Sequence, residues 1–304
     1  MDRKRVVLPL VTAALGNMFW GVSYLFTRTA LQVTTPEIML SVRFTISLLL
    51  MSVPLLLGRE KLSFKGKPLL PLIGMAVAET MVFFTESYGI LYTNATFAGV
   101  FVAVTPIVAM ALAALILKEY PTRRQILLCL LTVVGVIVTV LAGKSLGVVT
   151  AIGVVFLVLD CLSMAFYRLF NRWSGRNFSS FERTYAVLLV CAVVFTAAAL
   201  ISVKGDVSAY LVPLTTPRFI LPVLALCLLC SVAANILVNY AASRLTVAKL
   251  SVFSSIVTLV STLSGVLILK EPFSLQSGVG TALILFGVWQ ISRPEKGENE
   301  EKTA

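Results

Sequence analysis

The sequence predicts an all-α integral membrane protein with ten membrane-spanning helices in two inverted five-helix repeats. Three observations predict this fold class. Hydrophobic residues make up 58% of the 304 residues and charged residues only 13%, which is too little charge to cover a water-facing surface. Basic residues gather in alternate connections, and a short motif recurs at half the chain length.

Apolar runs of about 20 residues are long enough to cross a bilayer as helices. Short connections with turn or charge signals separate them, including Gly66, Gly143-Lys144 and Pro217. The first run is longer than the apolar core of a signal peptide, so we interpret it as an uncleaved helix. The expected spans are Val6–Phe26, Ile38–Leu57, Leu69–Leu91, Phe97–Leu117, Ile126–Ala142, Val148–Phe170, Thr184–Ser202, Phe219–Val238, Val247–Leu269 and Leu275–Ser292.

Charge placement predicts the orientation. With a cytoplasmic N-terminus and an even number of spans, about four in five of the 25 Lys and Arg residues fall in cytoplasmic segments, Arg168 and Arg183 among them. The same bias explains the net charge of +11 without a nucleic-acid partner. We therefore expect a multi-pass protein of the cell (inner) membrane with both termini cytoplasmic and a disordered polar tail over 293–304.

An internal repeat predicts the domain organisation. Leu-Ile-Leu-Lys-Glu at 115–119 recurs at 267–271, and Gly135-Val136 recurs as Gly287-Val288 at the same offset of 152 residues. Because five spans per copy is an odd number, the second copy enters the membrane upside down. The expected units are 1–145 and 146–292.

Three patches resemble a known family. They are Tyr92–Ala98 leading to Pro106 and Leu117-Lys118-Glu119, Leu269–Gln276 with Lys270-Glu271-Pro272, and Arg43-Phe44. On these residues the chain resembles the EamA family of the drug/metabolite transporter superfamily. The resemblance implies ten helices around a central cavity, alternating access, and export of small metabolites, amino acids or drugs. It also favours structural or coupling roles for Arg43, Pro106, Glu119 and Glu271.

Carboxylates inside apolar spans are costly and normally face the bundle interior. Glu79 and Glu86 lie seven residues apart, on one helix face. They can line a cation or proton site, or they can pair with Arg43 or meet water at the membrane edge. Asp160 can bind a cationic group beside an aromatic wall or make a helix–helix hydrogen bond. Since desolvation disfavours a charged carboxyl group, coupling to protons is possible.

Aromatic and amide side chains complete the predicted site. Asn17, Trp20 and Tyr24 share one helix face, which can line the cavity or form an aromatic belt with packing residues. The amides of Asn235 and Asn239 need partners in lipid and must face protein or a cavity. The expected substrate-binding residues are Asn17, Trp20, Tyr24, Glu79, Glu86, Tyr88, Asp160, Tyr167, Asn235 and Asn239.

Two further intramembrane residues have open interpretations. Arg43 can extend to the interface, pair with a glutamate, or meet a substrate carboxylate. Pro106 can mark the binding site by breaking its helix, or it can form a packing kink.

Missing motifs argue against enzymes. The chain has no His and no P-loop pattern, so we expect no metal, no cofactor and no ATP hydrolysis. Cys227 and Cys230 match the CxxC spacing of redox and metal sites, but we favour the interpretation that they are two small apolar residues of a membrane helix.

The predicted function is a secondary active transporter that exports amino acids, amines or drugs, with protons as possible partners and the membrane lipid as its surroundings. The alternatives are a membrane-embedded enzyme or lipid-handling protein, and a structural or receptor protein.

Overall fold

The computed structural model describes residues 3–105, 107–108, 111–112, 122–145, 149–245 and 247–291. Every regular element in these ranges is helical. In order they are α1 (Arg3–Ala30), α2 (Pro36–Leu56), α3 (Leu70–Tyr92), α4 (Ala95–Val102), α6 (Arg123–Ser145), α7 (Ala151–Ser174), α8 (Ser180–Ser202), α9 (Val207–Leu211), the 3-10 turn η1 (Val212–Thr215), α10 (Pro217–Ala225), the π-helical segment η2 (Leu226–Ala233), α11 (Ala234–Ala242), α12 (Val247–Leu267) and α13 (Leu275–Ile291).

Six of these helical stretches are long and apolar enough to cross a membrane: Val7–Ala30, Pro36–Leu56, Leu70–Tyr92, Ala151–Ser174, Ser180–Ser202 and Pro217–Ala242. Shorter apolar helices cover Ile126–Ala142, Ile256–Leu267 and Leu275–Gly287. The fourth expected span runs into residues outside the described ranges, so the number ten remains a prediction. The expected connection at Gly143-Lys144 is wrong, because α6 continues through both residues to Ser145.

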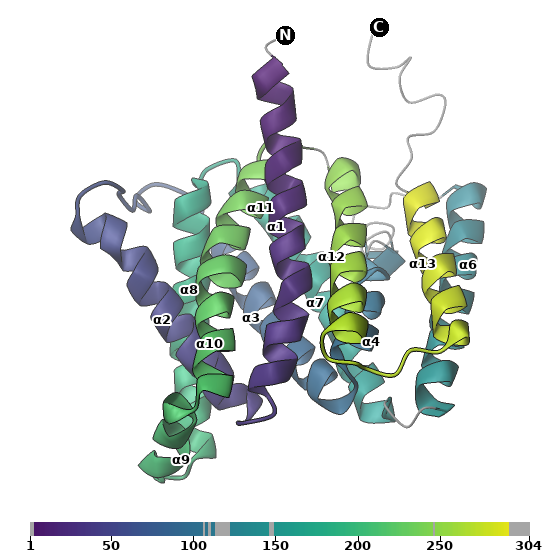
Figure 1. Ribbon diagram of the computed structural model, residues 1–304. Helices are drawn as coiled ribbons and strands as arrows, with labels where there is room; N and C mark the ends of the chain where they lie inside the picture. The colour runs from purple at the N-terminus through teal and green to yellow at the C-terminus, as the bar shows by residue number, and fades with distance from the viewer. Residues whose placement is uncertain are drawn as a thin grey trace, which may run out of the picture.

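The helices form a bundle with a central group and two flanking pairs (Figure 1). In the centre α3 packs along α7, and α1 packs against α11 and α12. On one flank α2 packs against α8, and on the other α6 packs against α13. The start of α1 and the end of α13 lie at the same end of the bundle (Figure 1).

Helix α3 shows that the lipid-facing surface is apolar and the inner surface polar. Its exposed residues include Ile73 and Val77, which lie one turn apart. Its buried residues include Glu79, Phe83 and Glu86 on the opposite face. A helix with this distribution hides its polar groups from lipid, as membrane-spanning bundles require.

Local signals explain where helices begin and end. Pro36 and Pro217 each stand in the first turn of a helix, where a missing N–H costs nothing. Gly66 adopts a positive φ of 76° in the turn before α3, a conformation that favours glycine. A capping box of Ser179 and Glu182 starts α8.

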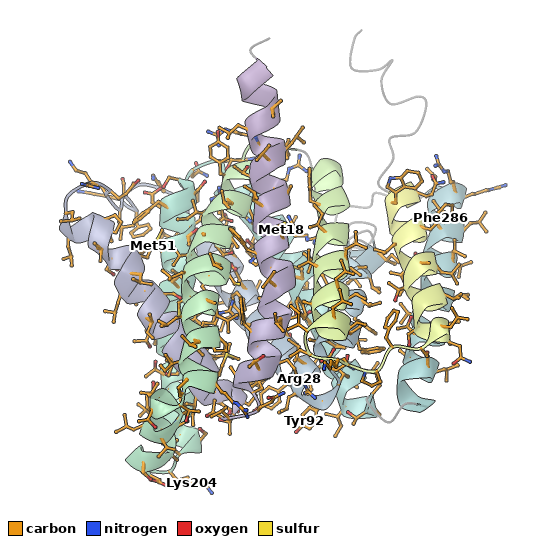
Figure 2. The ribbon with its side chains drawn as sticks, viewed as in Figure 1. Met18, Arg28, Met51, Tyr92, Lys204 and Phe286 are labelled. Carbon is orange, nitrogen blue, oxygen red and sulfur yellow. The ribbon has the colours of Figure 1, made fainter. Side chains whose placement is uncertain are left out.

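At the end of the bundle where α1 finishes, Glu271 ties several elements together. Its two carboxylate oxygens accept from the backbone N–H groups of Ala95 at 3.0 Å and Thr96 at 2.8 Å, at the N-terminus of α4. Arg28 donates to Ile90 O at 3.0 Å and lies 4.0 Å from Glu271; Figure 2 shows it beside the end of α3. A carboxylate is favourable at a helix N-terminus because the free N–H groups there carry partial positive charge.

Candidate functional site

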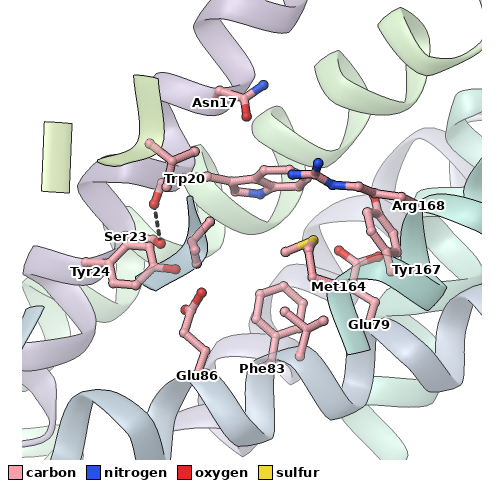
Figure 3. A pocket seen from close by; sticks show the side chains of 13 residues that line it. Asn17, Trp20, Ser23, Tyr24, Glu79, Phe83, Glu86, Met164, Tyr167 and Arg168 are labelled. Atoms are coloured by element: carbon pink, nitrogen blue, oxygen red, sulfur yellow. Dashed lines mark hydrogen bonds between the residues drawn. The ribbon is translucent and has the colours of Figure 1, made fainter. Parts of the chain in front are cut away.

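A small cavity lies in the middle of the bundle, between α1, α3 and α7 (Figure 3). Val102 of α4 and Val257 of α12 also contribute to its wall. The space open to the centre of a water molecule is about 30 Å³, which holds about two waters. The lining residues from the three main helices are Asn17, Trp20, Ser23, Tyr24, Glu79, Val82, Phe83, Glu86, Met164, Tyr167 and Arg168.

The α1 wall consists of residues that share one helix face. Asn17 and Tyr24 are 5% and 2% exposed. The Asn17 amide donates to Ala13 O at 2.8 Å, which leaves its oxygen free to face the cavity. The indole Nε1 of Trp20 is buried and finds no hydrogen-bond partner among the described residues. This wall therefore offers aromatic surface together with unused polar groups.

The α3 wall carries two carboxylates separated by Phe83. Glu79 is 2% exposed and Glu86 is 7% exposed. Glu79 Oε2 is buried without a hydrogen-bond partner in the described part of the chain. The Tyr24 hydroxyl points toward the Glu86 carboxylate (Figure 3). Because neither glutamate pairs with a base within 4.0 Å among the described residues, both remain able to bind a cation or a proton.

Arg43 lies behind this wall and not in the cavity lining. Its guanidinium sits 4.7 Å from the centre of the Phe83 ring and 5.1 Å from that of Phe44. Its Nε donates to Ser231 Oγ at 2.8 Å, and the side chain is 1% exposed. Its charge acts on Glu79 and Glu86 across Phe83, without direct contact.

Asp160 forms a second acidic position beside the cavity. It is 1% exposed, and Oδ1 has no hydrogen-bond partner among the described residues. Thr85 and Glu86 of α3 are its polar and charged neighbours. It does not line the cavity itself.

A hydrogen-bonded network anchors the Tyr167 end of the cavity. The Tyr167 hydroxyl accepts from the Asn171 amide at 2.9 Å and donates to Asn239 Oδ1 at 3.3 Å. Arg183, which is fully buried, donates to the Asn171 side chain and to Asn239 O. The expectation that Arg183 lies in a connection is wrong: it belongs to the first turn of α8 and is a buried cation held by neutral acceptors.

The two predicted amides of the eighth span have different surroundings. Both polar atoms of the Asn239 side chain are hydrogen-bonded in the network, since its amide nitrogen also donates to Thr184 Oγ1 at 3.0 Å. Asn235 is 1% exposed, and both polar atoms of its side chain lack a hydrogen-bond partner in the described ranges. Glu79 is a close neighbour of Asn235. Neither amide belongs to the cavity lining.

Arg168 is the charged residue of the cavity lining that sequence reasoning missed. It was counted with the basic loops, yet it belongs to α7 and its side chain extends into the cavity (Figure 3). The helical spacing from Asp160 and Met164, at steps of four residues, was the available signal. It places a positive charge in a cavity otherwise lined by carboxylates, aromatic rings, small polar groups and apolar side chains.

Other predicted residues lie elsewhere. Tyr88 is outside the cavity; it donates to Glu37 and stacks on Phe156, with ring centres 5.1 Å apart. Pro106 and Glu119 lie outside the described residues.

Cys227 and Cys230 are buried free thiols whose sulfur atoms donate to backbone oxygens of Arg43 and Phe19, each at 3.2 Å. Among the described residues, no three His, Cys, Asp or Glu side chains lie close enough together to hold a metal.

The family profile of the EamA-like transporters matches residues 7–141 and again residues 151–293. The chain belongs to the EamA-like transporter family. Its two matched segments cover almost the whole bundle, and the cavity is lined from both of them. This EamA-like chain is therefore a multi-pass membrane protein of transporter type.

Two relatives support the assignment. The chain is 33% identical over 282 residues to the uncharacterized transporter YcxC of Bacillus subtilis (strain 168), covering 91% of this chain and 90% of that protein. It is 22% identical over 287 residues to an uncharacterized transporter of Archaeoglobus fulgidus, covering 93% and 98%. A crystal structure of a protein with 17% identity superposes with a TM-score of 0.66 over 92% of this chain and 94% of the other, which shows a shared fold.

Proposed function

We propose that this EamA-like protein is a secondary active transporter that exports a small metabolite, such as an amino acid, an amine or a drug, by alternating access. The observation that carries the proposal is that Glu79 and Asp160 are buried carboxylates, each with one oxygen (Glu79 Oε2, Asp160 Oδ1) that lacks a hydrogen-bond partner in the described part of the chain. A passive scaffold gains nothing from the cost of inserting such groups. A transporter uses them to bind a cation or a proton and release it again.

The architecture we propose is ten spans in two inverted repeats, 1–145 and 146–292, with both termini on the cytoplasmic side of the cell (inner) membrane. Packing between the two halves supports it. Helix α2 packs against α8, α4 against α12, and α6 against α13, so the second, fourth and fifth helices of each matched segment meet their counterparts. Contacts of this kind are expected around a pseudo-two-fold axis.

This symmetry gives a physical basis for alternating access. Two similar units that enclose one central site can rock between openings toward either side. The cavity has room for about two waters, so it must enlarge to admit a solute. Proteins of transporter type move their solute without changing it, and we propose no catalytic role for the chain.

The test is transport by the purified protein in sealed liposomes, with and without an imposed pH gradient. Labelled amino acids, amines and organic anions form the panel. We expect at least one solute to move, and Glu79→Gln and Asp160→Asn to lower its rate by about tenfold or more. Glu60→Gln, in an exposed loop, is the matched control and should match the parent. The proposal is wrong if no solute moves; if solutes move but both variants behave like the parent, the site assignment is wrong.

Orientation has its own test. Thiols introduced at Lys118 and Lys270 should be labelled by a membrane-impermeant reagent from opposite sides of the bilayer. Labelling of both from one side would refute the inverted repeat.

A further inference from the structure

The guanidinium of Arg168 lines the cavity and finds no ion-pair partner in the described part of the chain. The side chain is partly buried and lines the cavity wall. It has no hydrogen bond, and no carboxylate oxygen lies within 4.0 Å of it, among the described residues. Arginine stays protonated in proteins, so it cannot reduce the cost of burial by losing its charge. An intramembrane arginine in this situation needs an anion.

Its helix offers a direct comparison. Arg172 lies one turn further along α7 and is exposed, as an arginine at a membrane edge normally is. Arg168 extends into the cavity instead (Figure 3). Of these two arginines on α7, Arg172 is exposed and Arg168 lines the cavity.

The opposite charge lies on another helix. Glu79 and Glu86 come from α3, and Glu79 Oε2 is buried without a hydrogen-bond partner in the described ranges. The guanidinium of Arg43, another internal cation, lies 4.7 Å from the centre of the Phe83 ring and does not line the cavity. The cavity therefore has a cationic wall on α7 and an anionic wall on α3. Between them lie apolar side chains, including Trp20 and Met164.

We propose that the transported solute is a small zwitterion, and that Arg168 binds its anionic group while Glu79 and Glu86 bind its cationic group. The guanidinium can hold a carboxylate through two parallel hydrogen bonds. The ring of Trp20 and the thioether of Met164 contact the apolar part of the solute. A zwitterion neutralises both walls at once, whereas a simple amine leaves Arg168 unpaired and a simple carboxylic acid leaves the glutamates unpaired. This inference rests on the proposed transport function and narrows its substrate class.

The experiment uses matched sets of solutes with the full-length protein in liposomes. Each set contains an apolar α-amino acid, the amine that lacks its carboxylate, and the acid that lacks its ammonium group; valine, isobutylamine and 3-methylbutanoate form one set. We expect the amino acid of at least one set to be transported about tenfold or more faster than either analogue, because a site built for a polar group rejects analogues that leave it unpaired.

The variants are Arg168→Gln, Arg168→Lys and the control Arg172→Gln. Arg168→Gln should raise the KM for the amino acid about tenfold or more, because the contact to its carboxylate is lost, and should reduce the preference for the amino acid over the amine, because the amine no longer leaves a charge unpaired. Arg168→Lys, which keeps the charge but not the paired hydrogen bonds, should fall between. Arg172→Gln should behave like the parent.

The outcomes separate this inference from the proposed function. If solutes move but Arg168→Gln and Arg168→Lys keep the parent KM, or if the amine moves as well as the amino acid, the zwitterion proposal is wrong and transport stands. If the parent protein transports only solutes without an anionic group, the zwitterion proposal is also wrong and the transport function stands. If the parent moves nothing, both proposals fall. Should Arg168→Gln fold poorly, Arg168→Lys together with the comparison of solutes on the parent protein decides the question.

Discussion

Helices α4 and α12 are in close contact where Gly99 faces Ser261. A Cβ built on Gly99 would overlap the Ser261 side chain at both Cβ and Oγ, while the next neighbour, Ser261 Cα, lies at 3.8 Å. The Thr258 hydroxyl donates to Gly99 O at 3.0 Å across the same contact. Because the Cβ of Ser261 cannot rotate away, Gly99→Ala must push the two helices apart.

The expected cost follows from this geometry. Overpacking a tight contact costs about 2 kcal/mol, which lowers the melting temperature by roughly 4–8 °C. In the Ser261→Gly background the overlap disappears and the nearest atom is at ordinary contact distance. Alanine is then better than glycine in a helix by about 0.5–1 kcal/mol. Gly99→Ala should therefore destabilise the parent and stabilise the Ser261→Gly variant.

Thermal unfolding of the four proteins in detergent measures this reversal of sign. Gly278→Ala is the control, since its new Cβ would meet only Phe273 Cε1 at 3.5 Å, and it should leave the melting temperature unchanged or slightly raised. If Gly99→Ala matches Gly278→Ala in the parent background, or if Ser261→Gly does not reverse its effect, the close helix contact is refuted.

Three further predictions concern connections at the bundle ends. Glu271→Gln removes the charge at the α4 N-terminus and should lower the free energy of unfolding by about 1 kcal/mol, whereas Glu60→Gln should not; equal melting temperatures for the two would contradict the cap. The pKa of Asp206 lies below its usual value of 3.8 because the Ser208 hydroxyl and the α9 N–H groups bond its carboxylate. Asp206→Ala should thus reduce stability at neutral pH, and the difference should vanish as the pH falls through the lowered pKa; a pH-independent difference in melting temperature would argue otherwise. Lys67, 3.0 Å from Glu182, is partly exposed, so Lys67→Met should cost less than about 1 kcal/mol and less still at high salt, which melting curves at two salt concentrations can check.

Helical periodicity accounts for the part of the site that the sequence predicts. Asn17, Trp20 and Tyr24 share a helix face, as do Glu79 and Glu86, and the structure places these five around one cavity. Each set follows from spacing within one helix, which local sequence determines. That they face each other depends on packing between helices, which no local pattern encodes.

The same periodicity could have excluded Tyr88. It stands two residues after Glu86, about 200° further around the helix, and it stacks on Phe156 outside the cavity. The position of Arg168 required more than spacing, since an arginine near the end of an apolar run can face either water or the interior. The π-helical turn over Leu226–Ala233 also had no sequence signal, because one additional residue in a helical turn leaves composition unchanged.

The small volume of the cavity has a kinetic consequence. Space for about two waters cannot hold a continuous file of solvent from one face of the membrane to the other. Under the proposed alternating access, each molecule carried waits for one cycle of helix displacement, an event on the microsecond to millisecond scale or slower. Flux should saturate at a turnover number fixed by that cycle, and cooling should slow it far more steeply than it slows diffusion through an open pore.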